Sequence, residues 1–187
     1  MRVVAGSAGG VHLIVPKTDI RPTMDRVKAA IFSSLGDKVP GARVLDLFAG
    51  TGSLGIEALS RGSASAVFVE NNAAAAETIK RNFAKTGLRG EVRQMDVFSF
   101  LDRAAKPGEF DIVFADPPYA KAPGERDFGA ELLASVSLAA ALAPEGIFVL
   151  EKMPGDPFPR RMRWLCSRLK KYGATEVAFL HPIEDAQ

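Results

Sequence analysis

The sequence predicts an α/β fold: a mostly parallel sheet of seven strands, helices on both of its faces, and an antiparallel hairpin at its C-terminal end. Three observations support this prediction. From position 43 onward, apolar runs of strand length alternate with helical patterns, which is typical of parallel sheets. Residues 44–55 pass from an apolar run through a turn of small residues into a helical pattern. Near the C-terminus, only Gly173 and Ala174 separate two strand-like runs, and so short a link permits only antiparallel pairing.

The predicted elements divide the chain into an N-terminal appendage, residues 1–40, and a larger domain, residues 41–187. In the appendage, residues 2–6 and 11–15 predict a small β-hairpin, and a helix follows from Thr23 or Asp25 to about Leu35. In the larger domain, strands are predicted at 43–47, 65–69, 91–94, 111–115, 146–150, 167–172 and 175–180. Helices are predicted at 53–60, 73–86, 97–101 and 128–142.

The turn after the first of these strands is a candidate cofactor site. Gly50 and Gly52 allow positive φ and close approach of a ligand, and the helix that begins near Ser53 points its first N–H groups into the same space. The spacing Gly-x-Gly-x-x-Gly is formally that of a dinucleotide site, so spacing alone leaves a nicotinamide or flavin cofactor open. Asp46 favours another ligand, because a carboxylate repels a pyrophosphate but attracts the amino group and sulfonium of S-adenosylmethionine.

Two further acids follow the next two strands. Glu70 lies near the offset at which an acid binds ribose hydroxyls in nucleotide sites. Asp96 can accept a hydrogen bond from an adenine amino group while Val97 packs on the ring, although an acid that caps the next helix fits the same position equally well. Together with Asp46, these acids predict a nucleoside-containing cofactor at the carboxyl edge of the sheet.

The fourth strand of the larger domain ends in Asp116, Pro117, Pro118 and Tyr119. An exocyclic amine of a nucleobase is a poor nucleophile, since its lone pair is delocalised into the ring. The Asp116 carboxylate and the Pro117 carbonyl can each accept one of its N–H groups and orient the lone pair at a methyl group. Tyr119 supplies a face on which an extruded base can stack. The segment predicts methylation of a nucleobase amine, whereas a rigid turn plugged by Tyr119 is the alternative when the segment is taken alone.

Composition limits the class of protein. The 187 residues are 47% apolar, carry a formal net charge of +2 and include one cysteine, Cys166, which excludes an internal disulfide framework. We expect a cytoplasmic protein without a metal cluster, since no apolar run reaches the length of a membrane span and no export signal is present. Basic residues gather in two stretches: Arg21, Arg26, Lys28; and Arg160, Arg161, Arg163, Arg168, Lys170, Lys171. Either a solvated face or an RNA contact explains them.

Four segments together resemble the RsmD family of 16S rRNA guanine-N2 methyltransferases. They are residues 44–52, 116–119, 2–6 and 21–27, and the last, with its Arg-Pro-Thr-x-Asp-Arg-Val pattern, is the most particular to that family. The resemblance covers nearly the whole chain. It implies the Rossmann-like fold of class I S-adenosylmethionine-dependent methyltransferases, S-adenosylmethionine as cofactor, and 16S rRNA as partner, within a small-subunit assembly particle.

The resemblance also implies roles for individual residues. The implied cofactor-binding residues are Asp46, Phe48, Ala49, Gly50, Gly52, Ser53, Leu54, Glu70, Asn71, Asp96 and Val97. The implied catalytic residues are Asp116, Pro117 and Tyr119, and the implied substrate-binding residues are Arg21, Thr23, Arg26 and Pro118. No metal ligand is implied. One departure concerns residues 7–11, which are neutral here, whereas the family usually has basic residues in this turn. A contribution of this turn to RNA binding is therefore not expected.

Three alternatives share parts of this pattern. A DNA adenine-N6 or cytosine-N4 methyltransferase uses the same Asp-Pro-Pro-Tyr chemistry, but this chain offers no separate DNA-reading domain. A protein-glutamine methyltransferase shares the fold and favours Asn where this chain has Asp116. A noncatalytic RNA-binding scaffold has no need of the intact segment 116–119.

Overall fold

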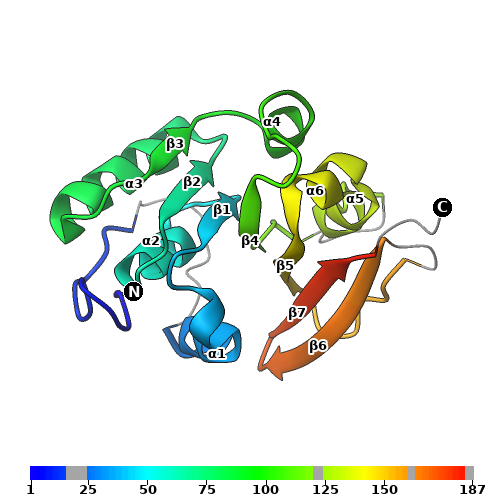
Figure 1. The fold of residues 1–187 in the computed structure, drawn as a ribbon, viewed down its shortest axis with the longest axis horizontal. Coiled ribbons are helices and arrows are strands. Elements are labelled where there is room, and N and C mark those ends of the chain that lie inside the picture. The colour runs from blue at the N-terminus through cyan, green and yellow to red at the C-terminus, as the bar shows by residue number, and fades with distance from the viewer. Residues whose placement is uncertain (16–24, 120–123, 160–162, 184–187) are drawn as a thin grey trace.

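The computed structural model describes residues 1–15, 25–119, 124–159 and 163–183. Within these ranges, seven strands form one sheet in the order β3-β2-β1-β4-β5-β7-β6 (Figure 1). Their bounds are β1 Arg43–Leu47, β2 Ser65–Val69, β3 Glu91–Arg93, β4 Phe110–Ala115, β5 Leu142–Lys152, β6 Trp164–Tyr172 and β7 Thr175–Pro182. The first five strands pair in parallel, whereas β7 runs antiparallel to both β5 and β6. The predicted mostly parallel sheet with an antiparallel C-terminal hairpin is confirmed.

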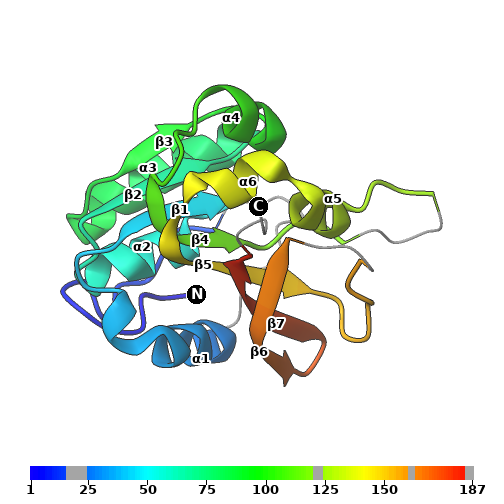
Figure 2. The same ribbon diagram turned by 45° about the vertical axis from the view of Figure 1, so that its right-hand side comes forward.

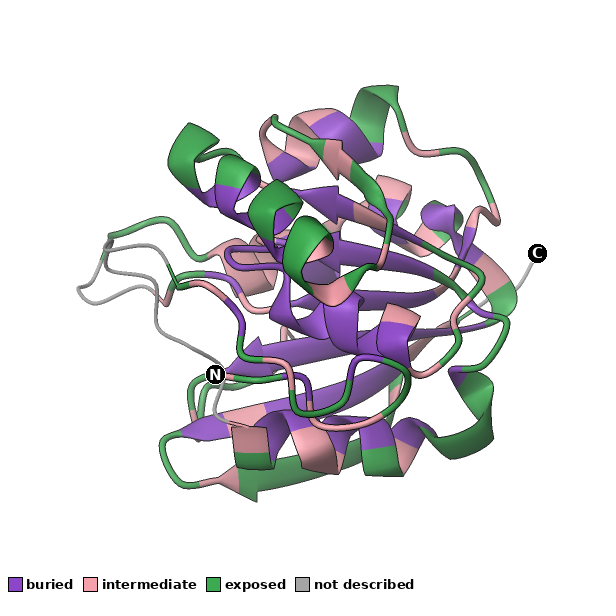
Figure 3. Cartoon of the chain, turned by 90° about the vertical axis from the view of Figure 1, so that its left-hand side faces the viewer, coloured by how far each residue is buried: buried purple, intermediate pink, exposed green. Residues whose placement is uncertain are grey.

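Helices cover both faces of this sheet (Figure 2). Their bounds are α1 Asp25–Leu35, the short 3-10 helix η1 Gly36–Lys38, α2 Ser53–Ser60, α3 Ala73–Thr86, α4 Val97–Arg103, α5 Phe128–Ala134 and α6 Val136–Ala141. Because side chains alternate along a strand, Val44 packs with the core beneath α1, α2 and α3, while Leu45 packs with the core beneath α4, α5 and α6. Figure 3 shows the buried residues gathered in the sheet and the exposed ones on the outer turns of the helices.

The strand order reverses direction at the centre of the sheet. From β1 the chain moves outward to β2 and β3, then crosses back to β4 on the other side of β1 and continues to β5. In open parallel sheets, ligands bind outside the carboxyl ends of the strands at such a reversal. The loops that follow β1 and β4 therefore flank the predicted site.

The predicted N-terminal hairpin is wrong as a pair of strands. A single antiparallel bridge joins Arg2 to His12, and no regular strand forms on either side of it in residues 1–15. Backbone hydrogen bonds from the Val3 N–H to the Val11 carbonyl and from the Leu13 N–H to the Met1 carbonyl flank this bridge, but pairing does not continue because polar groups of α2 accept the next backbone donors. The N–H groups of Val4 and Ala5 donate to the Glu57 carboxylate, and that of Ala8 donates to the Ser60 hydroxyl.

The single helix predicted at 128–142 is two helices, which is a second correction. Ser135 has extended dihedral angles of φ −69° and ψ 118°, so it ends α5, and its hydroxyl then caps α6 by accepting the N–H of Leu138 at 3.1 Å. The predicted helix also extends one residue too far, because Leu142 is the first residue of β5 and pairs with Phe110. Ser135 is thus a helix boundary that apolar periodicity alone does not reveal.

The C-terminal strands start earlier or run further than predicted, and β6 begins at Trp164. The Trp164 side chain is buried, and its Nε1–H donates to the Leu133 carbonyl at 2.9 Å. It therefore fastens β6 to α5. Lys28, a member of the N-terminal basic stretch, is also buried, so neither a solvated face nor an RNA contact explains it. Arg160 and Arg161 lie outside the described residues.

Candidate active site

The chain after β1 is bent tightly by three residues with positive φ. They are Phe48 at 55°, Gly50 at 55° and Gly52 at 76°. Gly52 is also the residue that caps α2, without a side chain to occupy the helix N-terminus. Phe48 is the only non-glycine residue with positive φ in the described part of the chain, and such a conformation costs free energy that the surroundings must offset. Nothing in the sequence around Phe48 indicates this conformation.

Gly55 explains why the glycine pattern formally matches a dinucleotide site. A Cβ atom at this position would lie 2.3 Å from a ring carbon of Phe68 on β2. The third glycine therefore allows α2 to pack closely on the sheet, a requirement that is independent of the ligand.

Asp46 lies at the carboxyl end of β1 and is only 2% exposed. Its Oδ2 accepts the N–H of Gly55 at 2.8 Å, so the carboxylate also fixes the start of α2. Burial raises the pKa of Asp46 to about 8, and the negative charges of Asp116 and Glu70 act in the same direction against the hydrogen bond from Gly55. A positively charged ligand group beside Asp46 would favour its ionised form.

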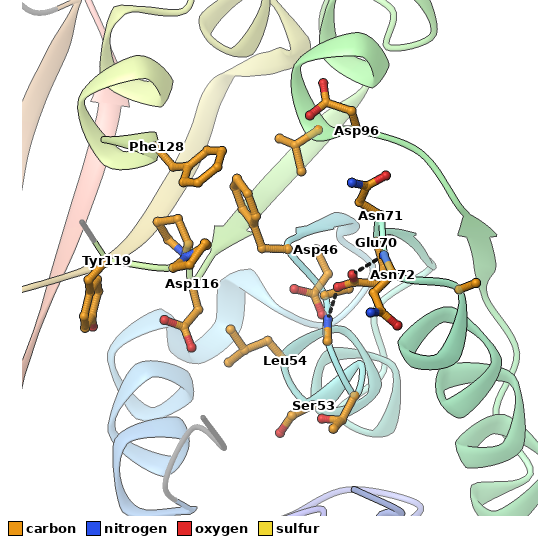
Figure 4. Close-up of a pocket in the computed structure, with 18 of the residues that line it drawn as sticks. Asp46, Ser53, Leu54, Glu70, Asn71, Asn72, Asp96, Asp116, Tyr119 and Phe128 are labelled. Atoms are coloured by element: carbon orange, nitrogen blue, oxygen red, sulfur yellow. Dashed lines mark hydrogen bonds between the residues drawn. The ribbon is translucent and has the colours of Figure 1, made fainter. Parts of the chain in front are cut away.

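Glu70, which directly follows β2, links the glycine turn after β1 to the loop after β2 by hydrogen bonds (Figure 4). One carboxylate oxygen accepts the N–H of Gly50 at 2.8 Å, and the other accepts the N–H of Asn72 at 2.7 Å. Each carboxylate oxygen has further acceptor capacity, so these bonds leave Glu70 able to receive ligand hydroxyl groups.

Asp96, after β3, performs the capping role that was the alternative for this position. Its side chain accepts the N–H of Ser99 at 2.9 Å and begins α4. The same residue, together with Val97, lines the cavity described below. Capping holds the carboxylate at the cavity wall, so the two interpretations are compatible.

The Asp116–Tyr119 segment follows β4 on the opposite side of the cavity. In Figure 4, Asp116 and Tyr119 lie on one side, and Glu70, Asn71 and Asp96 on the other. The Tyr119 hydroxyl forms a hydrogen bond of 2.8 Å with the Thr175 hydroxyl at the start of β7. The segment is thus attached to the antiparallel hairpin as well as to β4.

These groups surround one cavity of about 1020 Å³. The residues predicted from the sequence to belong to the site that do line this cavity are Asp46, Phe48, Ala49, Gly50, Ser53, Leu54, Glu70, Asn71, Asp96, Val97, Asp116, Pro117, Pro118 and Tyr119. Of the other predicted site residues, Gly52 lies at the α2 N-terminus and Arg26 is exposed on α1, and neither lines the cavity. Arg21 and Thr23 fall outside the described residues.

Other residues that line the cavity were not predicted from the sequence as site residues. These lining residues are Met1, Thr51, Asn72, Ala73, Arg126 and Phe128. Phe128 packs edge-on against Phe48 at 5.4 Å between ring centroids, and the Arg126 guanidinium lies 4.6 Å from the centre of the Phe128 ring. Arg126 is held there by a bidentate ion pair with Glu131. The sequence predicted a helix that begins at Phe128 but not these contacts. They depend on the path of the chain between β4 and α5.

The donor set fits a nucleoside that carries a positive charge. Three carboxylates lie at the carboxyl ends of three adjacent strands: Asp46 within β1, Glu70 directly after β2 and Asp96 after β3. Apolar side chains from Leu54, Val97 and Phe128 line the same cavity. Carboxylates suit a cation, sugar hydroxyls and a base amino group, but not a pyrophosphate. In the described residues there is no group of three or more His, Cys, Asp or Glu side chains arranged to hold a metal ion. Every helix in the described ranges is too short or too polar to span a bilayer.

Residues 1–181 match the family described as conserved hypothetical protein 95. The chain belongs to that family. It is 39% identical to YlbH, a candidate rRNA methyltransferase of Bacillus subtilis (strain 168), over 95% of this chain and 97% of that protein. It is 38% identical to ribosomal RNA small subunit methyltransferase D of Escherichia coli (strain K12), over 64% of this chain and 60% of that protein. The resemblance to the RsmD family is confirmed.

Solved structures agree with the fold. A hypothetical protein of Thermus thermophilus matches 97% of this chain and 99% of its own at 31% identity, with a TM-score of 0.80. The T. thermophilus 16S rRNA N2 G1207 methyltransferase RsmC, solved with AdoMet and guanosine, matches 89% of this chain and 44% of its own at 24% identity, with a TM-score of 0.68. This chain therefore has the class I methyltransferase fold.

Proposed function

We propose that this protein is a cytoplasmic methyltransferase that transfers a methyl group from S-adenosylmethionine to the exocyclic N2 amine of a guanine in 16S rRNA. The observation that carries the proposal is the shared cavity, in which the three carboxylates at the carboxyl ends of β1, β2 and β3 face the Asp116–Tyr119 segment after β4. One wall suits the cofactor and the other suits a nucleobase amine. The names of YlbH and of the E. coli small subunit methyltransferase support ribosomal RNA as the substrate class.

The cofactor-side residues bind and orient. Asp46 faces the charged methionine end, Glu70 receives ribose hydroxyls, and Asp96 with Val97 holds the adenine. S-adenosylmethionine, when bound, supplies an electrophilic methyl group on a sulfonium. The enzyme then needs neither a metal ion nor a covalent intermediate, because positioning and polarisation suffice for a direct displacement.

The substrate-side residues prepare the nucleophile. The Asp116 carboxylate and the Pro117 carbonyl each accept one N–H of the guanine amine, which directs its lone pair toward the methyl group. As the N–C bond forms and the S–C bond breaks, the nitrogen becomes positively charged and loses one proton, for which Asp116 is the adjacent acceptor. The ring of Pro117 fixes its φ and the following Pro118 restricts its ψ, which together hold the Pro117 carbonyl in place.

The proposed division of roles is tested by Asp116→Ala. Turnover of small-subunit RNA should fall by about 100-fold or more, because a group that acts on the reacting amine is lost. The dissociation constant for S-adenosylmethionine, measured by calorimetry, should change little. Asp46→Ala should instead raise the dissociation constant for S-adenosylmethionine, because Asp46 acts on the cofactor side.

Asp111→Ala is the matched control. Asp111 lies near the other end of β4, where it pairs with Arg43, far from the carboxyl edge of the sheet. The turnover of the Asp111→Ala variant should equal that of the wild type. Undiminished turnover in Asp116→Ala would contradict the assigned role of Asp116.

A further inference from the structure

Thr175, the first residue of β7, connects the substrate side of the cavity to a buried acid. Its hydroxyl lies 2.8 Å from the Tyr119 hydroxyl and 3.4 Å from Oε2 of Glu151. Thr175 is 7% exposed and Glu151 is 5% exposed, so both groups lie out of bulk water. The three residues come from segments far apart in the sequence: the loop after β4, the end of β5 and the start of β7.

The direction of this chain of hydrogen bonds depends on the acceptors around Thr175. The Thr175 hydroxyl has one proton, which it can donate to the ionised Glu151 carboxylate or to the Lys152 carbonyl, each at 3.4 Å. Donation to either of them leaves the Thr175 oxygen as an acceptor. The Tyr119 hydroxyl can then donate in the 2.8 Å bond, for which either hydroxyl is a possible donor.

This bond restricts the Tyr119 ring at its far end. The chain enters Tyr119 through two prolines, whose φ angles are fixed, and the hydroxyl at the other end of the ring is held by β7. Rotation about χ1 would break the bond inside a poorly solvated site, where an unmade hydrogen bond is costly. The ring thus presents a fixed face to the cavity that it lines with Asp116.

We infer that Thr175, supported by Glu151, is a positioning residue that fixes the Tyr119 ring for stacking of the target guanine. The inference rests on the proposed function, because it specifies how that site holds its substrate. Thr175 acts through Tyr119 and touches neither cofactor nor reacting atoms. Because the bond holds the hydroxyl end of the ring, the aromatic face is the part of Tyr119 offered to the base.

The test is Thr175→Val, which keeps the shape of the side chain and removes its hydroxyl, with Thr175→Ser as the conservative control. Under single-turnover conditions at saturating S-adenosylmethionine, Thr175→Val should lower the rate on small-subunit RNA by about tenfold, the usual effect of one hydrogen bond. Thr175→Ser should stay near the wild-type rate. The dissociation constant for the cofactor should be equal in all three proteins, which a general disturbance of the fold would not allow.

A double-mutant cycle assigns the effect to the bond itself. Tyr119→Phe removes the other partner, so the variant carrying both Tyr119→Phe and Thr175→Val should be no slower than the slower single variant. Additive losses, or a Thr175→Val rate equal to that of the wild type, would overturn the inference.

A second readout does not depend on turnover. The chain has two tyrosines, so incorporation of 3-fluorotyrosine gives two fluorine resonances, with Tyr172 as the internal reference. Thr175→Val should shift and sharpen the Tyr119 resonance and weaken guanosine monophosphate binding followed through it. If the wild type methylates no RNA, the proposed function fails, and this titration still decides the inference: equal binding in wild type and Thr175→Val overturns it, and weaker binding in the variant supports it.

Discussion

At the scale of single residues, Asp46 gives the proposed cofactor site a dependence on pH. Burial raises the pKa of its carboxyl group to about 8, so in the ligand-free protein the group holds its proton below that pH. A cationic ligand prefers the ionised form. Binding of S-adenosylmethionine must then release this proton, and the affinity should rise by about tenfold per pH unit from pH 6 toward pH 8.

Calorimetry between pH 6 and 7.5 measures this slope, and Asp46→Asn is the matched variant because it keeps the acceptor for the Gly55 N–H. The variant should bind more weakly than the wild type and show a flatter slope. A wild-type affinity that is constant over this range would show that Asp46 does not change its ionisation on binding.

At the scale of elements, a buried ion pair holds the N-terminal segment against α1 and α2. The Lys28 ammonium lies 3.5 Å from the Glu57 carboxylate and donates to the Arg2 carbonyl at 2.6 Å and to the Ser53 hydroxyl at 3.0 Å. The Lys28 and Glu57 side chains are both 0% exposed. Burial lowers the pKa of Lys28 while the Glu57 charge opposes that shift, so loss of the Glu57 charge leaves a buried cation without its counter-ion.

Glu57→Gln should therefore lower the free energy of unfolding by about 3 kcal/mol, measured by urea denaturation. Glu77→Gln is the control, because Glu77 pairs with Lys80 on the exposed side of α3 and its loss should cost less than about 0.5 kcal/mol. Equal stabilities of the two variants would contradict the structural role given to the Lys28–Glu57 pair.

The same pair shows where prediction from sequence stopped at this scale. Strands and helices from β1 to β4 followed from local periodicity, and the acids at the carboxyl ends of β1, β2 and β3 could be placed because parallel strands end at one edge. The N-terminal hairpin could not be judged, since Glu57 and Ser60 receive its backbone donors from 50 residues or more away in the sequence. The burial of Lys28 could not be predicted for the same reason, and the break at Ser135 is a local conformation that apolar spacing does not encode.

The site residues likewise fall into two groups, those that local sequence predicts and those that only the tertiary fold brings to the cavity. Those in the turn after β1 and in the Asp116–Tyr119 segment are contiguous in sequence, so their chemistry was visible there. Arg126 and Phe128 reach the cavity only through the return of the chain after β4, and Thr175 only through pairing of β7 with β5. Contacts of this kind are set by topology, which composition and spacing do not specify.

At the scale of the whole molecule, the cavity joins segments that follow four different strands, so a bound cofactor should stabilise the entire fold. At a concentration 100 times its dissociation constant, S-adenosylmethionine should add about 2.7 kcal/mol to the free energy of unfolding. For a chain of this size that corresponds to a rise in the melting temperature of roughly 5–10 °C. NAD at the same concentration should leave the melting temperature unchanged. A shift with NAD alone would restore the dinucleotide interpretation of the glycine turn.

The most direct test of the proposed function is incorporation of labelled methyl from S-adenosylmethionine into three substrates: naked small-subunit RNA, partly assembled small subunits from a strain lacking this enzyme, and duplex DNA. Nucleoside analysis should find the label as N2-methylguanine in one or both ribosomal substrates, and the better of the two shows whether bound proteins are required. Label in DNA alone, or no label in any substrate while the cofactor still binds, would contradict the assignment of ribosomal RNA as the substrate.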